Sequence, residues 1–131
     1  MRKIFFCALC ALALVSCKKN VVPEGKVEYC VTGDYTNVTE NSVTITCTSV
    51  TDKLFNVGRR GVWYSTNPEV IRDQCSEYSL NEGLDKEKYT VTIEGLLPGT
   101  TYYYRAFIRI KHEFTSSSYY TGSVKSFTTL P

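Results

Sequence analysis

The segment Gly95–Ala106, with the sequence GLLPGTTYYYRA, carries the strongest structural signal in the chain. Its Pro98-Gly99 pair predicts a tight turn, because proline presets one backbone angle and glycine adopts positive φ without steric strain. A strand is predicted to follow over residues 101–110, with side chains alternating between its two faces. One face would carry Tyr102, Tyr104, Ala106 and Ile108, and the other Tyr103, Arg105, Phe107 and Arg109.

Outward from this segment, the chain contains further short stretches that read as strands. The clearest is Ser42–Thr48 (SVTITCT), in which apolar and hydroxyl side chains alternate. Such alternation is typical of a strand with one buried face. The other predicted strands cover residues 27–32, 60–66, 77–80, 89–94 and 123–129. Six or seven short strands separated by turn residues predict an all-β antiparallel sandwich.

Gly95–Ala106 resembles the E–F corner of a fibronectin type III domain, an immunoglobulin-like β-sandwich of about seven strands. The resemblance implies that Tyr102 is the tyrosine corner, whose hydroxyl bonds back to the upstream backbone. Three further segments, in the expected order, are similar to the variant found in lipoproteins of the Bacteroidetes: Asn41–Thr44, Gly61–Thr66 and Val124–Thr129. The resemblance implies one fibronectin type III-like domain over residues 27–131. Tyr104 stands where immunoglobulin domains carry their second core cysteine, which excludes that disulfide.

The first residues are typical of an export signal. A basic Met1-Arg2-Lys3 precedes an uncharged run of 12 residues, Ile4–Val15. About 20 apolar residues are needed to span a bilayer, so this run predicts a signal peptide. The tetrapeptide ending at Cys17, LVSC, resembles a bacterial lipobox, which implies cleavage before Cys17 and acylation of its thiol. The alternatives are an ordinary secretory signal and a buried N-terminal helix.

The predicted organisation is therefore a lipoprotein signal peptide over 1–16, a lipidated cysteine and tether over 17–26, and the domain. Acyl chains on Cys17 would make the membrane a partner. By analogy, Lys18 favours the outer membrane of the cell envelope, and the face that the domain occupies stays open. Removing residues 1–16 leaves 131 − 16 = 115 residues, with 15 − 2 = 13 basic and 13 acidic side chains. This neutral balance gives no indication of nucleic-acid binding.

The residues that support catalysis or metal binding are few. His112 is the only histidine, and no Gly-x-Ser-x-Gly motif is present. Cys30, Cys47 and Cys75 follow no zinc-ligand spacing. The sequence therefore predicts no enzyme, no catalytic residues, no metal and no cofactor. Cys30 and Cys47 are about equally far from a turn near Val38, so a hairpin could pair them in a disulfide; the alternative is buried thiols.

The candidate binding residues lie on the outer sheet face. If Val62 and Tyr64 point to the core, Trp63 points outward, and on the neighbouring strand so do three more residues, Tyr103, Arg105 and Phe107. Such an aromatic and cationic patch could stack a sugar or dock a protein, since Trp, Tyr and Arg dominate binding hot spots. The alternative is cross-strand packing that stabilises the sheet.

A second candidate is the predicted loop Lys111–Gly122, whose Tyr/Ser-rich composition is typical of adaptable binding loops. Its alternative is a flexible polar hairpin tip. Together these features predict a lipid-anchored envelope lipoprotein that acts as a non-catalytic binding or structural module, with an unknown protein as partner. The alternative function is glycan binding that assists polysaccharide capture, with Trp63 as the stacking platform.

Overall fold

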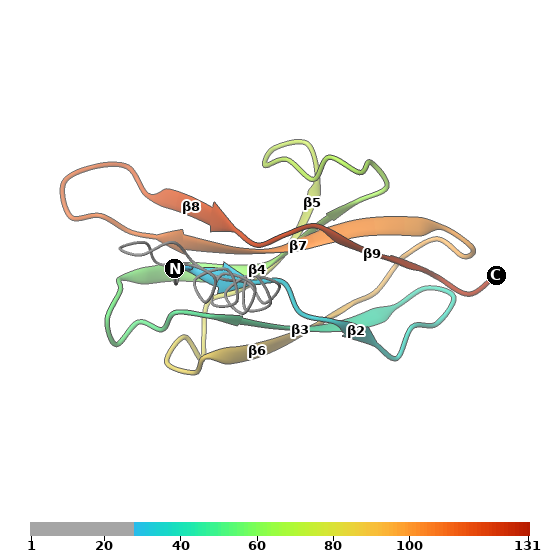
Figure 1. The fold of residues 1–131 in the computed structure, drawn as a ribbon, viewed down its shortest axis with the longest axis horizontal. Coiled ribbons are helices and arrows are strands. Elements are labelled where there is room, and N and C mark those ends of the chain that lie inside the picture. Colours follow the sequence, from blue (N-terminus) through green and yellow to red (C-terminus); the bar gives the residue numbers. More distant parts are fainter. Residues whose placement is uncertain (1–27) are drawn as a thin grey trace, which may run out of the picture.

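The structure is a computed structural model that describes residues 28–131, which form two antiparallel sheets (Figure 1). In the first sheet, the central β3 (Val43–Ser49) pairs with β6 (Lys88–Ile93) on one side, and with β1 (Cys30–Val31) and β2 (Tyr35–Thr36) on the other. The second sheet has the order β5 (Ser76–Leu80), β4 (Val57–Ser65), β7 (Thr101–Ile110), and then both β8 (Ser118–Thr121) and β9 (Lys125–Thr128). The predicted sandwich is confirmed. The pairs β1/β2 and β8/β9 each act as one interrupted strand, so that the strands fill seven positions.

Most predicted strands are present within one to three residues of their expected bounds. The predicted strand 27–32 is reduced to β1, and two short strands, β2 and β8, lie in segments that were expected to be loops. The predicted signal peptide, residues 1–16, and the tether with Cys17, residues 17–26, lie outside the described residues. No helix in the described part of the chain is long and apolar enough to cross a membrane.

The core lies between the sheets and follows the predicted alternation. Side chains at every second position of the central strands are almost fully buried; they include Val43, Ile45, Val62, Val91, Ile93, Tyr104, Ala106 and Ile108. β-Branched and aromatic side chains fill such a half-buried pleated surface well, which is why these segments form strands. On the solvent side of the first sheet, threonine hydroxyls pair across strands, as between Thr46 and Thr90 at 2.9 Å.

Arg60 is a charged exception within this core. It points inward on β4 with 1% of its surface exposed. Its guanidinium donates hydrogen bonds of 2.8 Å to the Ser49 hydroxyl and of 2.8 Å to the Gly83 carbonyl, and lies 4.6 Å from the centre of the Tyr89 ring. Desolvation lowers the pKa of Arg60 from its usual value. Arg60 therefore connects the two sheets at the end of the domain where β3 ends.

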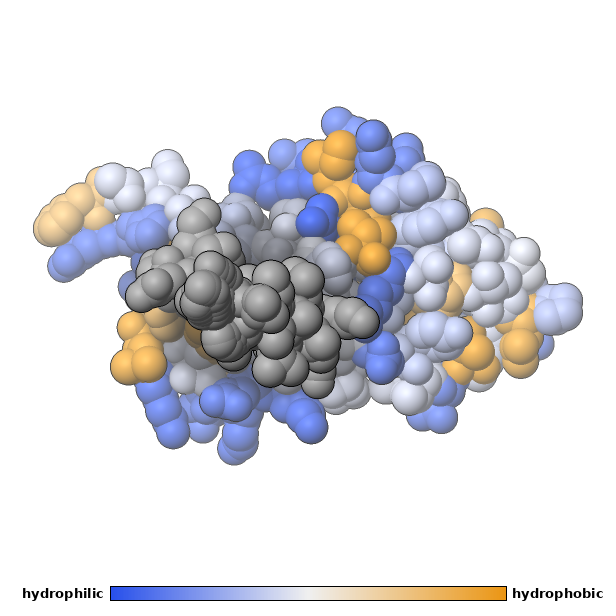
Figure 2. Space-filling view, viewed as in Figure 1, coloured by the Kyte–Doolittle hydropathy of each residue, from blue (hydrophilic) through white to orange (hydrophobic). Residues whose placement is uncertain are grey.

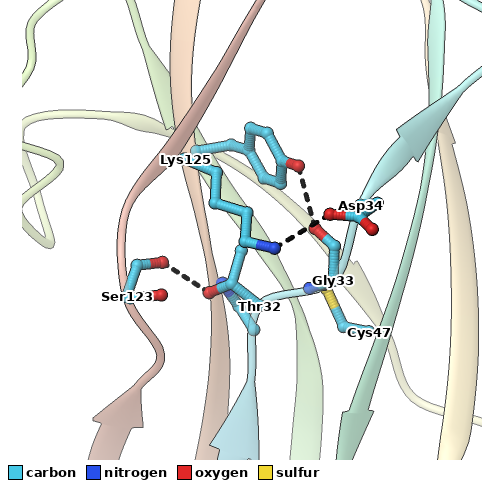
Figure 3. A network of polar contacts seen from close by, with 8 residues as sticks. Thr32, Gly33, Asp34, Cys47, Ser123 and Lys125 are labelled. Carbon is cyan, nitrogen blue, oxygen red and sulfur yellow. Dashed lines mark hydrogen bonds and ion pairs between the residues drawn. The ribbon is translucent and has the colours of Figure 1, made fainter. Parts of the chain in front are cut away.

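The interruption in the first strand lets the N-terminal segment contact both sheets (Figure 3). The Thr32 hydroxyl donates to the Ser123 carbonyl at 2.6 Å and accepts from the Ala106 amide at 3.0 Å. The Tyr104 hydroxyl donates to the Gly33 carbonyl at 2.8 Å. Thr32 thus lies in the gap between β8 and β9, which both pair with β7. Its hydroxyl satisfies the β7 amide of Ala106, which neither strand pairs.

Of the two alternatives for Cys30 and Cys47, the structure has the buried thiols and not the disulfide. The first strand does form an antiparallel pair with β3, but the register places Cys30 opposite Ser49. Both cysteines are buried free thiols. Each has its own polar contact: the Cys30 thiol donates to the Tyr120 carbonyl at 3.5 Å, and the Cys47 sulfur accepts from the Gly33 amide at 3.4 Å.

Thiol alkylation of the folded mature protein at neutral pH is expected to modify the half-buried Cys75 before the buried Cys30 and Cys47. Both latter thiols are buried, and burial raises the pKa of Cys30 to about 12, which suppresses its reactive thiolate. Mass spectrometry after a short exposure to iodoacetamide, with and without denaturant, measures this. Rapid modification of Cys30 in the folded protein would contradict its buried position.

The Tyr102 hydroxyl accepts a hydrogen bond of 2.9 Å from the Leu97 amide, five residues upstream, which is the bond expected of a tyrosine corner. We expect Tyr102→Phe to lower the free energy of unfolding by about 1 kcal/mol, the usual net contribution of one such bond. Urea denaturation measures the change. Tyr103→Phe, one position along on the opposite sheet face, is the matched control, and an equal loss there would argue against a special role for the corner.

Candidate binding site

The outer face of the five-stranded sheet brings the predicted binding residues together. The register places Trp63 opposite Arg105, Gly61 opposite Phe107, and Ser65 opposite Tyr103. Trp63 and Phe107 stack with ring centres 5.0 Å apart at an interplanar angle of 14°. The predicted clustering of Trp63, Tyr103, Arg105 and Phe107 on one face is therefore observed.

The expectation that this cluster is exposed is wrong. Trp63 is 4% and Phe107 0% exposed, because they form a second small core with Val70. Val70 belongs to the β4–β5 loop, residues 66–75, which covers the sheet face, and Tyr119 of β8 packs from the other side. A buried indole offers no platform for a sugar, so glycan stacking on Trp63 is excluded by this arrangement.

Arg105 fixes the position of the β4–β5 loop over the sheet. Its Nη1 donates to the Val70 carbonyl at 3.2 Å, and its Nε donates to the Gly122 carbonyl at 3.0 Å. The guanidinium therefore connects the β4–β5 loop to the segment that follows β8. Arg105 and Tyr103 are both half-buried. Of these two residues, Arg105 is the one that bonds to the β4–β5 loop.

The surface beside this small core contains residues that no sequence motif indicates. Arg59 forms an ion pair of 2.9 Å with Glu77, and its Nη2 donates to the Tyr119 hydroxyl at 3.1 Å. The hydrogen bond to Glu77 raises the pKa of Arg59. The guanidinium of Arg72 lies 4.3 Å from the centre of the Tyr119 ring, which is cation–π distance. Only the strand pairing of β8, which was expected to be a loop, reveals this cluster.

Two adjoining cavities open on this surface, and Asp73 and Cys75 line both. The first, of about 340 Å³, also contacts Arg59, Arg72, Glu77 and Tyr119. The second, of about 420 Å³, lies beside Tyr64, Ser65, Ser76 and Tyr102. We call the two cavities and the loop between them the β4–β5 surface.

The β4–β5 surface is polar and balanced in charge. Arg59 and Arg72 offset Asp73 and Glu77, and the exposed Asp73 adopts a positive φ of 73°. Burial raises the pKa of the Cys75 thiol, which favours its neutral form. The surface can therefore supply hydrogen bonds and paired charges, whereas it favours neither a strongly acidic nor a strongly basic ligand.

Tryptophan emission of the folded domain is expected to be blue-shifted and resistant to iodide and acrylamide. Trp63 is the only tryptophan in the chain, so the signal reports this one site. Its burial and the hydrogen bond of its Nε1 to Glu77, 3.2 Å long, keep water and quenchers away. Free N-acetyltryptophanamide is the exposed control. Red emission with quenching like that of the control would contradict the buried position.

His112 lies on an exposed loop, with its Nε2 2.8 Å from the Ser118 hydroxyl. Acyl transfer by such a pair needs a group that orients the histidine and an oxyanion-binding site. Among residues 28–131, no carboxylate accepts a hydrogen bond from His112, and no cluster of three potential metal ligands is found. The contact is therefore that of an exposed loop side chain with its neighbour.

The second predicted candidate, Lys111–Gly122, is only partly a loop. Its second half contains β8, whose Tyr119 and Tyr120 pack against opposite sheet faces. The remaining tip carries Phe114, which is 89% exposed. Figure 2 shows one face of the molecule, on which apolar residues lie in several separate areas. One of these areas is at the end of the domain that carries this tip.

Comparison with known proteins establishes the fold. No protein-family model matches the chain, and no curated protein matches it. Among solved structures, a DUF3823 family protein from Bacteroides uniformis is 17% identical, covers 78% of this chain and 55% of its own, and has a TM-score of 0.61. The sensor domain of the anti-sigma factor RsgI4 from Pseudobacteroides cellulosolvens is 19% identical over 77% of this chain and 92% of its own, with a TM-score of 0.51.

A fibronectin type III domain from the human KIAA0970 protein is similar as well. It is 14% identical, covers 79% of this chain and 74% of its own, and has a TM-score of 0.52. With identities this low, the similarity concerns the fold alone. The described residues have a fibronectin type III-like fold.

Proposed function

We propose that the chain is a lipid-anchored, non-catalytic protein of the bacterial envelope, and that its sandwich binds another protein through the β4–β5 surface. The anchor is Cys17, acylated after removal of residues 1–16, and the outer membrane is the membrane that Lys18 favours. Lipoproteins carry two or three acyl chains, which hold a domain durably, whereas a single chain binds only marginally.

The observation that carries the protein-binding proposal is a hollowed, preorganised surface rich in arginine and tyrosine. The loop that forms it is held at Val70 by Arg105, and its base is the stacked Trp63–Phe107 pair. The loop backbone is thus ordered before a partner arrives, which lowers the entropy lost on binding.

The exposed part of the β4–β5 surface offers the side chains that dominate protein interfaces. Arg72 has a side-chain exposure of 51% and Asp73 of 80%, so both are available to a partner, while Tyr119 beside them is half-buried. Arginine and tyrosine are enriched among hot-spot residues. Because the local charges balance, a partner with mixed polar and apolar contacts fits better than a highly charged polymer.

Similarity to non-enzymatic domains supports the non-catalytic part of the proposal. The comparison proteins include a domain described as a sensor and fibronectin type III domains. The three cysteines of the domain have buried or half-buried thiols, and burial raises the pKa of each. Fibronectin-like sandwiches serve many functions, so the binding role rests on the surface of this chain and not on the fold.

Site-specific photo-crosslinking in cells that produce the full chain tests the proposal. A photoreactive amino acid at Gln74, an exposed residue that lines the second cavity, should give a discrete protein adduct. Arg72→Glu should reduce that adduct at least fivefold. The matched control is the same photoreactive group at Thr92, exposed on β6 of the other sheet. The proposal fails if Gln74 yields no adduct, or the same adducts as Thr92.

A further inference from the structure

We propose that the end of the sandwich formed by the β3–β4 loop (residues 50–56) and the β7–β8 loop (residues 111–117) contacts the lipid surface of the membrane that holds the anchor. Leu54 and Phe114 are the side chains that enter the interfacial region of the bilayer. This inference rests on the lipid anchor at Cys17 proposed above, and it adds a second contact and a defined orientation.

Leu54 and Phe114 are unusually exposed for apolar side chains. Their exposures of 86% and 89% are the highest among the exposed large hydrophobic residues of the described chain. A single exposed apolar residue is normal on a protein surface. Leu54 and Phe114 lie in two loops at the same end of the domain, so both could enter one lipid surface without touching each other.

A hydrogen bond joins the two loops at their bases. The Lys111 amide donates to the Asn56 carbonyl at 2.7 Å, where the β3–β4 loop meets the β7–β8 loop. The Asp52 amide donates to the Leu84 carbonyl at 3.0 Å, which adds the β5–β6 loop to the same end. Figure 1 shows these loops gathered at one end of the sandwich. The two apolar tips therefore project from a shared base.

The chain joins the domain at this same end. Cys30 lies opposite Ser49, the last residue of β3, and the Val50 amide donates to the Tyr29 carbonyl at 2.9 Å. Cys17 is 28 − 17 = 11 positions before Glu28, the first described residue. At no more than about 3.6 Å per residue, acyl chains on Cys17 keep this end within roughly 40 Å of the bilayer.

The composition of the two loops suits the membrane interface. Lys53 precedes Leu54, and Lys111 and His112 precede Phe114. Basic side chains beside an apolar tip can reach lipid headgroups while the tip enters the acyl boundary. Asp52 and Glu113 lie in the same loops. With both signs of charge present, the apolar tips supply most of the contact, and we expect it to change little with salt.

Quenching by brominated lipids tests the contact on the full chain. The protein would be produced in a bacterium that processes lipoproteins, and reconstituted in vesicles of phosphatidylethanolamine and phosphatidylglycerol with brominated acyl chains. Phe114→Trp and Leu54→Trp report the proposed contact. Leu97→Trp is the matched control. Leu97 is 63% exposed and precedes β7, so it lies at the opposite end of the sandwich from the β7–β8 loop. There the Gly99 amide donates to the Leu130 carbonyl in the C-terminal segment. The buried Trp63 supplies the background to subtract.

Each outcome decides a separate point. Flotation with vesicles, an acylated N-terminal peptide, and quenching at positions 114 and 54 at least twice that at 97 would support the contact. Flotation with equal quenching at all three positions would leave the anchor in place and overturn the membrane contact, in favour of a protein partner at this end. A protein that carries no acyl chain and stays unbound would overturn the anchor, and this inference with it.

Discussion

Gly33→Ala is expected to lower the free energy of unfolding by about 3 kcal/mol, at the upper end for an overpacked site. A Cβ atom placed on Gly33 would lie 1.6 Å from the Thr46 carbonyl oxygen, which belongs to the backbone of β3 and cannot rotate away. The N-terminal segment would have to leave the sheet. It would then lose the Tyr104 bond to Gly33 and the Thr32 bonds to the second sheet (Figure 3).

Gly58→Ala is the matched control for this substitution. The atoms nearest to a Cβ at Gly58 would belong to the side chains of Lys111 and Arg109, the first at 3.0 Å, and these side chains can move. We expect a change within about 0.5 kcal/mol, as for most surface substitutions. Urea denaturation followed by Trp63 emission compares the two variants. Similar small losses in both would show that the N-terminal segment is not held against β3 as described.

Phe107→Ala is expected to lower the free energy of unfolding by about 4 kcal/mol, as for other buried aromatic residues truncated to alanine. Phe107 is fully buried on the outer face of the sheet, where its ring stacks on Trp63. The centre of its ring lies 6.4 Å from the centre of the Tyr119 ring. Removing the ring leaves a void beneath the β4–β5 loop. The loop cannot collapse into this void, because the Arg105 guanidinium holds it at the Val70 carbonyl.

Phe114→Ala removes the same ring from an exposed loop tip and serves as the control. At 89% exposure, Phe114 contributes almost nothing to the folded core, so a change within about 0.5 kcal/mol is expected. Thermal or urea denaturation of the two variants measures the difference. If Phe107→Ala were as mild as Phe114→Ala, the outer face would be open to solvent, as the strand pattern by itself suggested.

The strands and their facing could be predicted because they depend on local patterns. Alternation correctly assigned Val62 and Tyr104 to the core, and the turn at Pro98 led to the Tyr102 bond. The same alternation placed Trp63 on the outer face, which is where it lies. Local patterns failed at β8, whose four residues lie in a Ser/Tyr-rich segment and form a strand only because β7 pairs with them.

The candidate site could not be predicted to the same degree. Arg59, Arg72 and Tyr119 come from β4, the β4–β5 loop and β8, and nothing in their spacing indicates that they meet. Their cluster depends on the path of the β4–β5 loop, and that path depends on the Arg105 contact with Val70. Long-range contacts of this kind have no periodic signature in the chain.

The order of short alternating strands, their turns and the Tyr102 corner follow from the amino-acid sequence, because a strand's two faces repeat every second residue. Whether an outward-facing side chain meets water is a different matter. Trp63 and Phe107 are covered because Val70 and Tyr119, distant in the chain, fold over them. That cover, the register that separates Cys30 from Cys47, and the gathering of Leu54 and Phe114 at the end where the chain joins the domain arise only when the two sheets pack.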